Sequence, residues 1–412
     1  MGLLVAYLLS LAALHWLAPA LYLLPWDGEV DLDATLEGLR QSTFAIMALG
    51  VGAEVAARQE IRTIGTEEVG PDARIPSRLV NMYLVSGASL YVALFSAGSR
   101  LPTVRALVSC GSALMVVGIA LKCWNAWQEG KTWRLWSWLG AALGLPVMTV
   151  LSQGFLGYGY AAMLMVVTFC ISFRQWSWKA VALGLVAAYF GMSVYVTYMR
   201  DRDDIRETVW TGENTAARLA LLDAAVSSFE WFDWRNARHI ERVSGRLNQN
   251  YLVGSAVLYL RQGYSEFAKG DTLVQGALAV IPRVLWPDKP IVAGSGDLVS
   301  QYTGLHFGED TSVGIGHVME AYVSFGTRGV VGSFFVIGLL LVLADRSAAA
   351  YRNLGDAGRF LICYLPALGL LQVGGSFVEA TATAAGSYAV AILFWRLGHL
   401  LTVRAKSALD PT

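Results

Sequence analysis

The chain has 412 residues, of which 55% are hydrophobic and 15% are charged, and its mean hydropathy is +0.48. Soluble domains carry about 25% charged residues, so the composition excludes an ordinary soluble protein and indicates a polytopic membrane protein. The formal net charge of +0 gives no reason to expect nucleic acid or an acidic surface as a partner. The four cysteines lie in or beside apolar segments, and their spacing fits neither a zinc site nor a disulfide framework.

Apolar segments of the length that a bilayer requires recur along the chain. They cover residues 3–24, 39–57, 79–98, 102–122, 135–153, 157–173, 177–199, 329–344, 360–376 and 386–403. The first is too long for a typical signal peptide and is expected to remain as a membrane helix. The second contains Glu54, which would have to face the bundle interior or the interface. The sequence therefore predicts an all-α polytopic integral membrane protein with about ten transmembrane helices.

Loop charges predict the orientation of these helices. Acidic residues fill the first connection, whereas the second carries Arg58, Arg62, Arg74 and Arg78 and is therefore the better cytoplasmic candidate. Both termini are then cytoplasmic, and the long interval before the last three spans lies outside. We expect three parts: residues 1–199 with seven helices, an extracytoplasmic domain over 200–328, and residues 329–412 with three helices and a short cytoplasmic tail.

The extracytoplasmic interval is expected to contain short amphipathic helices, the first beginning at Thr215. Trp231, Phe232 and Trp234 suit an interfacial aromatic belt or a platform for sugars, and the sequence does not separate the two. The run SGRLNQN, residues 244–250, is predicted to be a short polar loop, in which Arg246, Asn248 and Asn250 either bind a ligand or satisfy backbone groups.

The run IPRVLWPDKP, residues 281–290, contains three prolines, each of which fixes φ and favours an extended residue before it. We expect a semi-rigid ribbon that suits an anionic ligand and holds Arg283, Trp286, Asp288 and Lys289. Arg283 could alternatively serve the dipole of the helix that ends there. The run GSGDLVSQYTG, residues 294–304, is typical of a flexible loop.

Residues 314–329 read GIGHVMEAYVSFGTRG. On a helix, His317, Glu320 and Ser324 share one face, because they stand at positions i, i+3 and i+7. The pair His317 and Glu320 supplies either a base with its orienting partner or a local cap or salt bridge at the membrane surface.

Three runs together, RLNQN, IPRVLWPDKP and HVMEAYVSFGTRG, resemble the signature region of bacterial Wzy-type O-antigen polymerases, which polymerise oligosaccharide repeat units. The architecture is also similar, with one large loop before the last spans. The resemblance implies a GT-C-like protein of the bacterial inner membrane with its large loop in the periplasm. It implies metal-independent, inverting en bloc transfer of a growing glycan from undecaprenyl pyrophosphate to a repeat unit on a second lipid carrier, giving an O-antigen or exopolysaccharide.

Residue chemistry suggests roles within that reaction. The departing pyrophosphate gains negative charge, which Arg283 and Arg246 would bind, with Lys289 assisting. The acceptor hydroxyl needs a general base, for which Glu320 is the first choice, His317 its partner or substitute, and Asp288 the third candidate. Asn248 and Trp286 are expected to contact substrate.

No carboxylate cluster typical of a hard-cation site is visible in the loop, so we expect no metal and no cofactor. The resemblance further implies a chain-length regulator and a flippase as membrane partners, and no nucleic acid. Two other functions stay open: an O-antigen ligase-type transferase of lipid-linked glycans, and a flippase or transporter for them. Transport would call for polar residues within the helices, of which the spans contain few.

Overall fold

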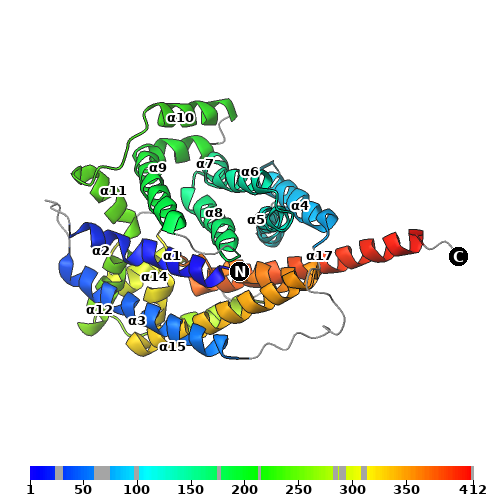
Figure 1. The fold of residues 1–412 in the computed structure, drawn as a ribbon. Helices are drawn as coiled ribbons and strands as arrows, with labels where there is room; N and C mark the ends of the chain where they lie inside the picture. Colours follow the sequence, from blue (N-terminus) through cyan, green and yellow to red (C-terminus); the bar gives the residue numbers. More distant parts are fainter. Residues whose placement is uncertain are drawn as a thin grey trace.

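The computed structural model describes residues 1–23, 31–59, 75–96, 102–173, 178–211, 215–281, 286, 294–307 and 313–409. Within these ranges all regular structure is helical and no strand occurs (Figure 1). Five helical segments among them are long and apolar enough to cross a membrane: Ala106–Gln128, Thr132–Gln153, Val181–Trp210, His317–Asn353 and Phe377–Leu400. The chain is a helical membrane protein.

Each of the ten predicted spans overlaps a helix or two consecutive helices. These are α1 (Leu3–His15), α2 (Leu17–Leu21), α3 (Leu32–Ala57), α4 (Ser77–Ser96), α5 (Pro102–Gln128), α6 (Thr132–Leu143), α7 (Leu145–Gln153), α8 (Leu156–Ile171), α9 (Trp178–Trp210), α15 (His317–Asn353), α16 (Ala357–Gly369) and α17 (Phe377–Leu409). Helices α1, α8 and α16 are apolar but shorter than a full span. The number of ten spans therefore stays a prediction.

Short helices occupy the described part of the interval between α9 and α15. They are α10 (Thr215–Ser227), α11 (Ala237–Leu247), α12 (Gln249–Arg261), α13 (Asp271–Ala279) and α14 (Ser295–Thr303). The predicted polar loop over 244–250 is wrong, because α11 extends to Leu247, α12 starts at Gln249, and Asn248 alone joins them. The flexible loop predicted over 294–304 is also wrong: it forms α14, whose first turn is closed by a 3.1 Å hydrogen bond from the Gly294 N–H to the Asp297 carboxylate.

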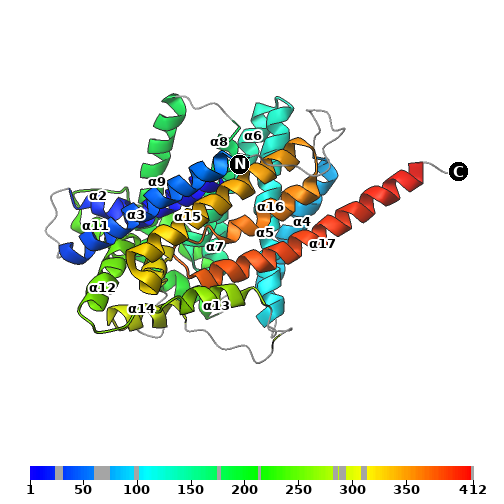
Figure 2. The same ribbon diagram turned by 90° about the horizontal axis from the view of Figure 1, so that it is seen from below.

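Helix α3 lies parallel to α15 with their backbones in direct contact (Figure 2). A Cβ atom added at Gly338 of α15 would lie 2.2 Å from the Leu49 carbonyl oxygen, and one at Gly52 of α3 would lie 2.0 Å from the Phe335 carbonyl oxygen. Only glycine permits this close approach. Membrane helices commonly pack through such small residues, because the hydrophobic effect does not drive helices together within lipid. Two residues after Gly52, Glu54 is exposed and pairs with Arg58 at 2.9 Å.

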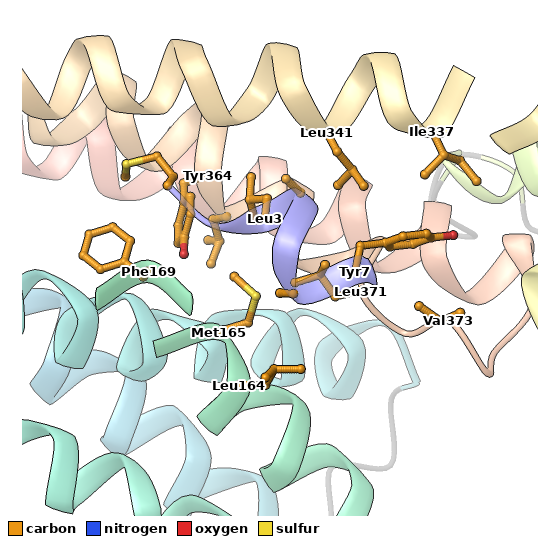
Figure 3. Packing of buried hydrophobic residues seen from close by; sticks show 14 of the residues in the cluster. Leu3, Tyr7, Leu164, Met165, Phe169, Ile337, Leu341, Tyr364, Leu371 and Val373 are labelled. Atoms are coloured by element: carbon orange, nitrogen blue, oxygen red, sulfur yellow. The ribbon is translucent and has the colours of Figure 1, made fainter. Parts of the chain in front are cut away.

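Helix α1 packs against α8, α15 and α3. Leu3, Tyr7 and Leu11 are fully buried, and Figure 3 shows Tyr7 lying between Ile337 of α15 and Val373. The Asp345 carboxylate of α15 accepts hydrogen bonds from the Gly2 and Leu3 N–H groups at 3.2 and 3.1 Å. A carboxylate in this position satisfies otherwise unpaired N–H groups at the start of α1.

Residues 181–191 of α9 are all exposed. Its large apolar side chains, among them Leu183, Leu185 and Val186, project from the protein surface. A helix that is apolar and exposed in this way fits hydrocarbon rather than water as its surroundings.

Candidate active site

The first two turns of α15 form a separate short helix that carries His317 and Glu320. Non-helical backbone at Phe325 and Gly326 kinks α15 just before the predicted domain boundary at 328. Ahead of the helix, Gly316 has φ +69°, and the N–H groups of Gly316 and His317 donate to the carbonyls of Gly374 and Val373 at 3.1 and 3.0 Å. The short helix is thereby joined to the segment that precedes α17.

His317 is buried and held from two sides. Its Nδ1 atom is hydrogen-bonded to the Tyr7 hydroxyl of α1 at 2.8 Å. Its ring stacks on Phe377 of α17, with centroids 4.8 Å apart and planes inclined by 18°. The Nε2 atom is buried and finds no hydrogen-bond partner among the described residues. The His317 imidazole therefore has a fixed orientation, and its Nε2 atom is not engaged by the described residues.

Glu320 has an exposed fraction of 0%. Its Oε2 atom accepts a 2.6 Å hydrogen bond from the Phe377 N–H at the start of α17, where the helix dipole also favours a negative charge. Within the described part of the chain, Oε1 is buried and without a partner. Sequence reasoning expected His317 to orient Glu320, whereas the bonds found here run from His317 to Tyr7 and from Glu320 to Phe377.

Two further contacts enclose this pair. Ser324, one turn after Glu320, is hydrogen-bonded to Thr272 of α13 at 2.9 Å. At the start of α17, the Ser376 N–H donates to the Glu379 carboxylate and the Glu379 N–H donates to the Ser376 hydroxyl, both at 3.2 Å. This reciprocal capping box fixes the α17 N-terminus against Glu320. The Ser-x-x-Glu spacing is readable in the sequence, although its nearness to Glu320 is not.

A second buried polar cluster forms where α1 and α2 meet the α11–α12 junction. The amide oxygen of Asn250, which is fully buried, lies 2.7 Å from His15 Nδ1, and its amide nitrogen donates to the His15 carbonyl. Asn248 Nδ2 donates to the Tyr22 hydroxyl at 2.8 Å and to Thr35 Oγ1 at 3.3 Å. These bonds favour the interpretation in which the asparagines satisfy buried polar groups, and Asn248 keeps a buried Oδ1 that accepts no hydrogen bond from the described residues.

Arg246 lies on α11 at one side of this cluster, half-buried. Burial lowers the pKa of its guanidinium, and the positive charge of Arg202 on α9 lowers that pKa further. Arg202 also pairs with Asp203 at 3.3 Å, and the charge of Asp203 raises the pKa of Arg246. One carboxylate thus partly balances the two arginines, and a bound phosphate would complete that balance.

The remaining predicted residues belong to the proline ribbon. Trp286 has an exposed fraction of 36%, while Arg283, Asp288 and Lys289 lie outside the described residues. The structure thus unites His317 with Glu320 and places Asn248 next to α2 and α3, the two groups being connected through α1.

Sequence reasoning missed two residues of α1, Tyr7 and His15. Both are polar groups on an otherwise apolar helix, eight residues apart and therefore near the same face, and that pattern was the available signal. Over the described residues, no group of three or more His, Cys, Asp or Glu side chains is arranged to hold a metal ion. The expectation of no metal remains a prediction.

Comparison of the chain with protein-family models, with curated proteins and with solved structures finds no match.

Proposed function

We propose that the chain is a polymerase of undecaprenyl-pyrophosphate-linked oligosaccharide repeat units, working at the periplasmic face of the bacterial inner membrane to make an O-antigen or exopolysaccharide. The observation that carries this proposal is the Glu320 carboxylate, buried with one oxygen held by the Phe377 N–H and the other unpaired. It stands in the run that resembles the signature region of Wzy-type polymerases, in a helical membrane protein.

In the proposed reaction, Glu320 is the general base. The acceptor sugar hydroxyl gives its proton to Oε1, and its oxygen attacks the anomeric carbon of the donor sugar from the face opposite the pyrophosphate. The bond from the anomeric carbon to the phosphate oxygen breaks, so the configuration inverts and undecaprenyl pyrophosphate leaves with the electron pair. His317, oriented by Tyr7, lies one turn away, and its imidazole provides a second acceptor for the proton.

The leaving pyrophosphate needs cations that keep their charge. Arg246, with Arg202 close enough to lower its pKa, is the described candidate. A guanidinium presents paired donors that match phosphate oxygens. In this proposal Arg283 and Lys289 of the proline ribbon supply further positive charge, Asn248 and Trp286 contact the sugars, and Asp288 remains the alternative base.

Glu320 is wholly enclosed, so the reaction requires an opening step. The groups to be displaced are those packed over it: the α17 N-terminus through Phe377 and α13 through Thr272. The backbone kink at Phe325 and Gly326 allows the short helix to turn without moving the rest of α15. Once the substrate has entered, the return of these groups over it would also exclude water, which otherwise competes with the acceptor sugar.

The test is chain elongation by the purified protein in nanodiscs, supplied with one synthetic lipid-linked repeat unit and a chelator. We expect a ladder of products from the wild type and none from Glu320→Gln, which keeps the side-chain shape. Glu266→Gln changes an exposed carboxylate that pairs with Lys269 and should retain the ladder. An unchanged ladder in Glu320→Gln would remove the assigned base, and no ladder from the wild type would remove the function.

One observation favours a second candidate, transport of the lipid-linked unit without chemistry. Buried ionisable groups inside apolar helices, here His15 in α1 and Glu320 in α15, are typical of transport pathways. A deletion strain distinguishes the possibilities by what accumulates. Single repeat units facing the periplasm indicate a polymerase, single units facing the cytoplasm indicate a flippase, and long lipid-linked chains indicate a ligase.

A further inference from the structure

The segment Ser228–Asp233, which follows α10, lies along α9 and is fixed to it by side chains. Tyr189, Ser193 and Thr197 stand four residues apart on one face of α9. Ser193 Oγ accepts from the Phe232 N–H at 3.0 Å, Thr197 Oγ1 accepts from the Glu230 N–H at 3.1 Å, and the Tyr189 hydroxyl donates to the Phe232 carbonyl at 3.1 Å. The segment therefore has a defined position although it has no secondary structure of its own.

Charged groups fix the same segment at its Glu230 end. The Glu230 carboxylate accepts hydrogen bonds from Arg200 at 2.7 Å and from Arg242 at 3.1 Å, and it lies 3.1 Å from His239 Nε2. The Asp233 N–H donates to His239 Nδ1 at 3.0 Å. Nδ1 is thus the acceptor, so Nε2 carries the proton and donates to Glu230.

Between this segment and α11 lies a surface cavity of about 350 Å³. Ligand pockets commonly hold about 300–1,000 Å³. Its lining includes Glu230, Trp231, Asp233, Asn236, Arg238 and Arg242. Two carboxylates thus face two guanidinium groups, together with one amide, one indole and the imidazole of His239. Because the charges balance, the lining suits a neutral polar ligand better than a phosphate, which calls for unopposed cations.

Trp231 gives this cavity an apolar face. Its ring stacks on Tyr189 with centroids 6.0 Å apart and planes inclined by 8°, and the Phe229 ring lies nearly perpendicular to it, with centroids 5.2 Å apart. These contacts hold the indole, yet 58% of the side chain stays exposed. A large aromatic ring that is both fixed and exposed loses little entropy when a ligand covers it.

Beside the indole, several hydrogen-bonding groups are available. Asp233 Oδ1 accepts from the Arg235 N–H, and Asn236 Oδ1 accepts from the Arg238 N–H. In the described residues, the Arg238 guanidinium and the Asn236 amide nitrogen have no protein partner. A pyranose sugar matches this set, since its C–H face covers an aromatic ring while its neighbouring hydroxyls bond in pairs to carboxylate, amide and guanidinium groups.

We propose that this cavity, with Trp231 as its platform, binds a pyranose residue of a glycan. The two tryptophans of the run 231–234 then have different roles. Trp231 faces the sugar, whereas Trp234 lies outside the cavity lining, with the Arg235 guanidinium 5.2 Å from its ring centre. The proposal rests on the proposed function for the origin of the glycan, which would be a lipid-linked repeat unit held away from Glu320 while its reacting end is positioned.

The test measures sugar binding directly, by saturation-transfer NMR on the full-length protein in nanodiscs, because maltoside detergents carry sugar head groups of their own. The probes are glucose, galactose, mannose, rhamnose, N-acetylglucosamine and glucuronic acid. We expect at least one to bind the wild type, to bind Trp231→Ala at least tenfold more weakly, and to bind the control Trp234→Ala with unchanged affinity. Trp231→Phe should lie between.

A second pair keeps the test valid if Trp231→Ala does not fold: Arg238→Ala should weaken binding, and the adjacent Arg235→Ala should not. Binding of none of the six sugars, equal binding by Trp231→Ala and Trp234→Ala, or displacement of the sugar by inorganic phosphate would each overturn the proposal. Elongation assays report on the function separately. Sugar binding without elongation would support the sugar-binding proposal and contradict the polymerase proposal. Elongation without sugar binding would support the polymerase proposal and contradict the sugar-binding proposal.

Discussion

The glycine contact between α3 and α15 leads to a quantitative prediction for Gly338→Ala. The added methyl group would lie 2.2 Å from the Leu49 carbonyl oxygen, so the helices would have to separate by roughly 1 Å to reach a normal contact distance. Over-packing costs about 1–3 kcal/mol, and alanine returns up to about 1 kcal/mol through helix propensity. Because the obstacle is backbone and cannot rotate away, we expect a net loss of about 2 kcal/mol, roughly thirtyfold in the unfolding equilibrium.

The chain contains its own reporters and its own control for this measurement. Cys110, Cys123 and Cys170 are buried, so a thiol-reactive dye added during heating reports unfolding. Gly338→Ala should lower the unfolding temperature by on the order of 2–4 °C. Gly332→Ala, on the same helix but with no atom near the added methyl group, should leave that temperature unchanged or raise it. Equal unfolding temperatures for the two variants would refute the backbone contact.

Three further changes test the polar groups. Tyr7→Phe removes the hydrogen bond to buried His317 and should lower stability by about 1–3 kcal/mol in the same dye assay; full stability would mean that the imidazole has another partner. Glu320→Gln should reduce the elongation rate by about 10²–10⁴, the range for loss of a general base, with normal yield of folded protein, and a smaller loss would assign Glu320 a structural role. The hydrogen bond from Arg200 holds the pKa of Glu230 below its usual range, so the stability from this bond is present above about pH 4.3 and is lost as the pH falls through the lower, folded pKa. Between pH 6 and pH 3 the unfolding temperature of the wild type should therefore fall more steeply than that of Glu230→Gln, and parallel curves would contradict the assignment.

Apolar length predicted where helices lie, because a bilayer imposes that length on any span. It did not predict where a span divides. The segment over 135–153 is broken between α6 and α7 at Gly144, and the first span is broken between α1 and α2 at Trp16. Pro146 and Pro19 lie just after these breaks and are the local signals, since proline is tolerated in the first turn of a helix but not in its interior.

The candidate site was only half predictable for a related reason. Helical spacing placed His317 and Glu320 on one face, which needed no knowledge of the fold. The partners of His317 and Asn250 are Tyr7 and His15, which are 310 and 235 residues distant in the chain. Pairings over such distances are set by how helices pack, and periodicity within one helix carries no information about them.

The position of α1 also has a consequence for biogenesis. Ribosomes add about 5–20 residues per second, so the imidazole of His15 precedes Asn250 by roughly 10–50 s and the phenol of Tyr7 precedes His317 by about 15–60 s. As part of the predicted first span, α1 would during that time carry two polar groups into the membrane without the partners that later satisfy them, at a cost that hydrocarbon makes high. Until α12 and α15 arrive, α1 has to be sheltered by water or by the insertion machinery. The hydrogen bonds of Tyr7 with His317 and of His15 with Asn250 are therefore formed late, around a helix that is made early.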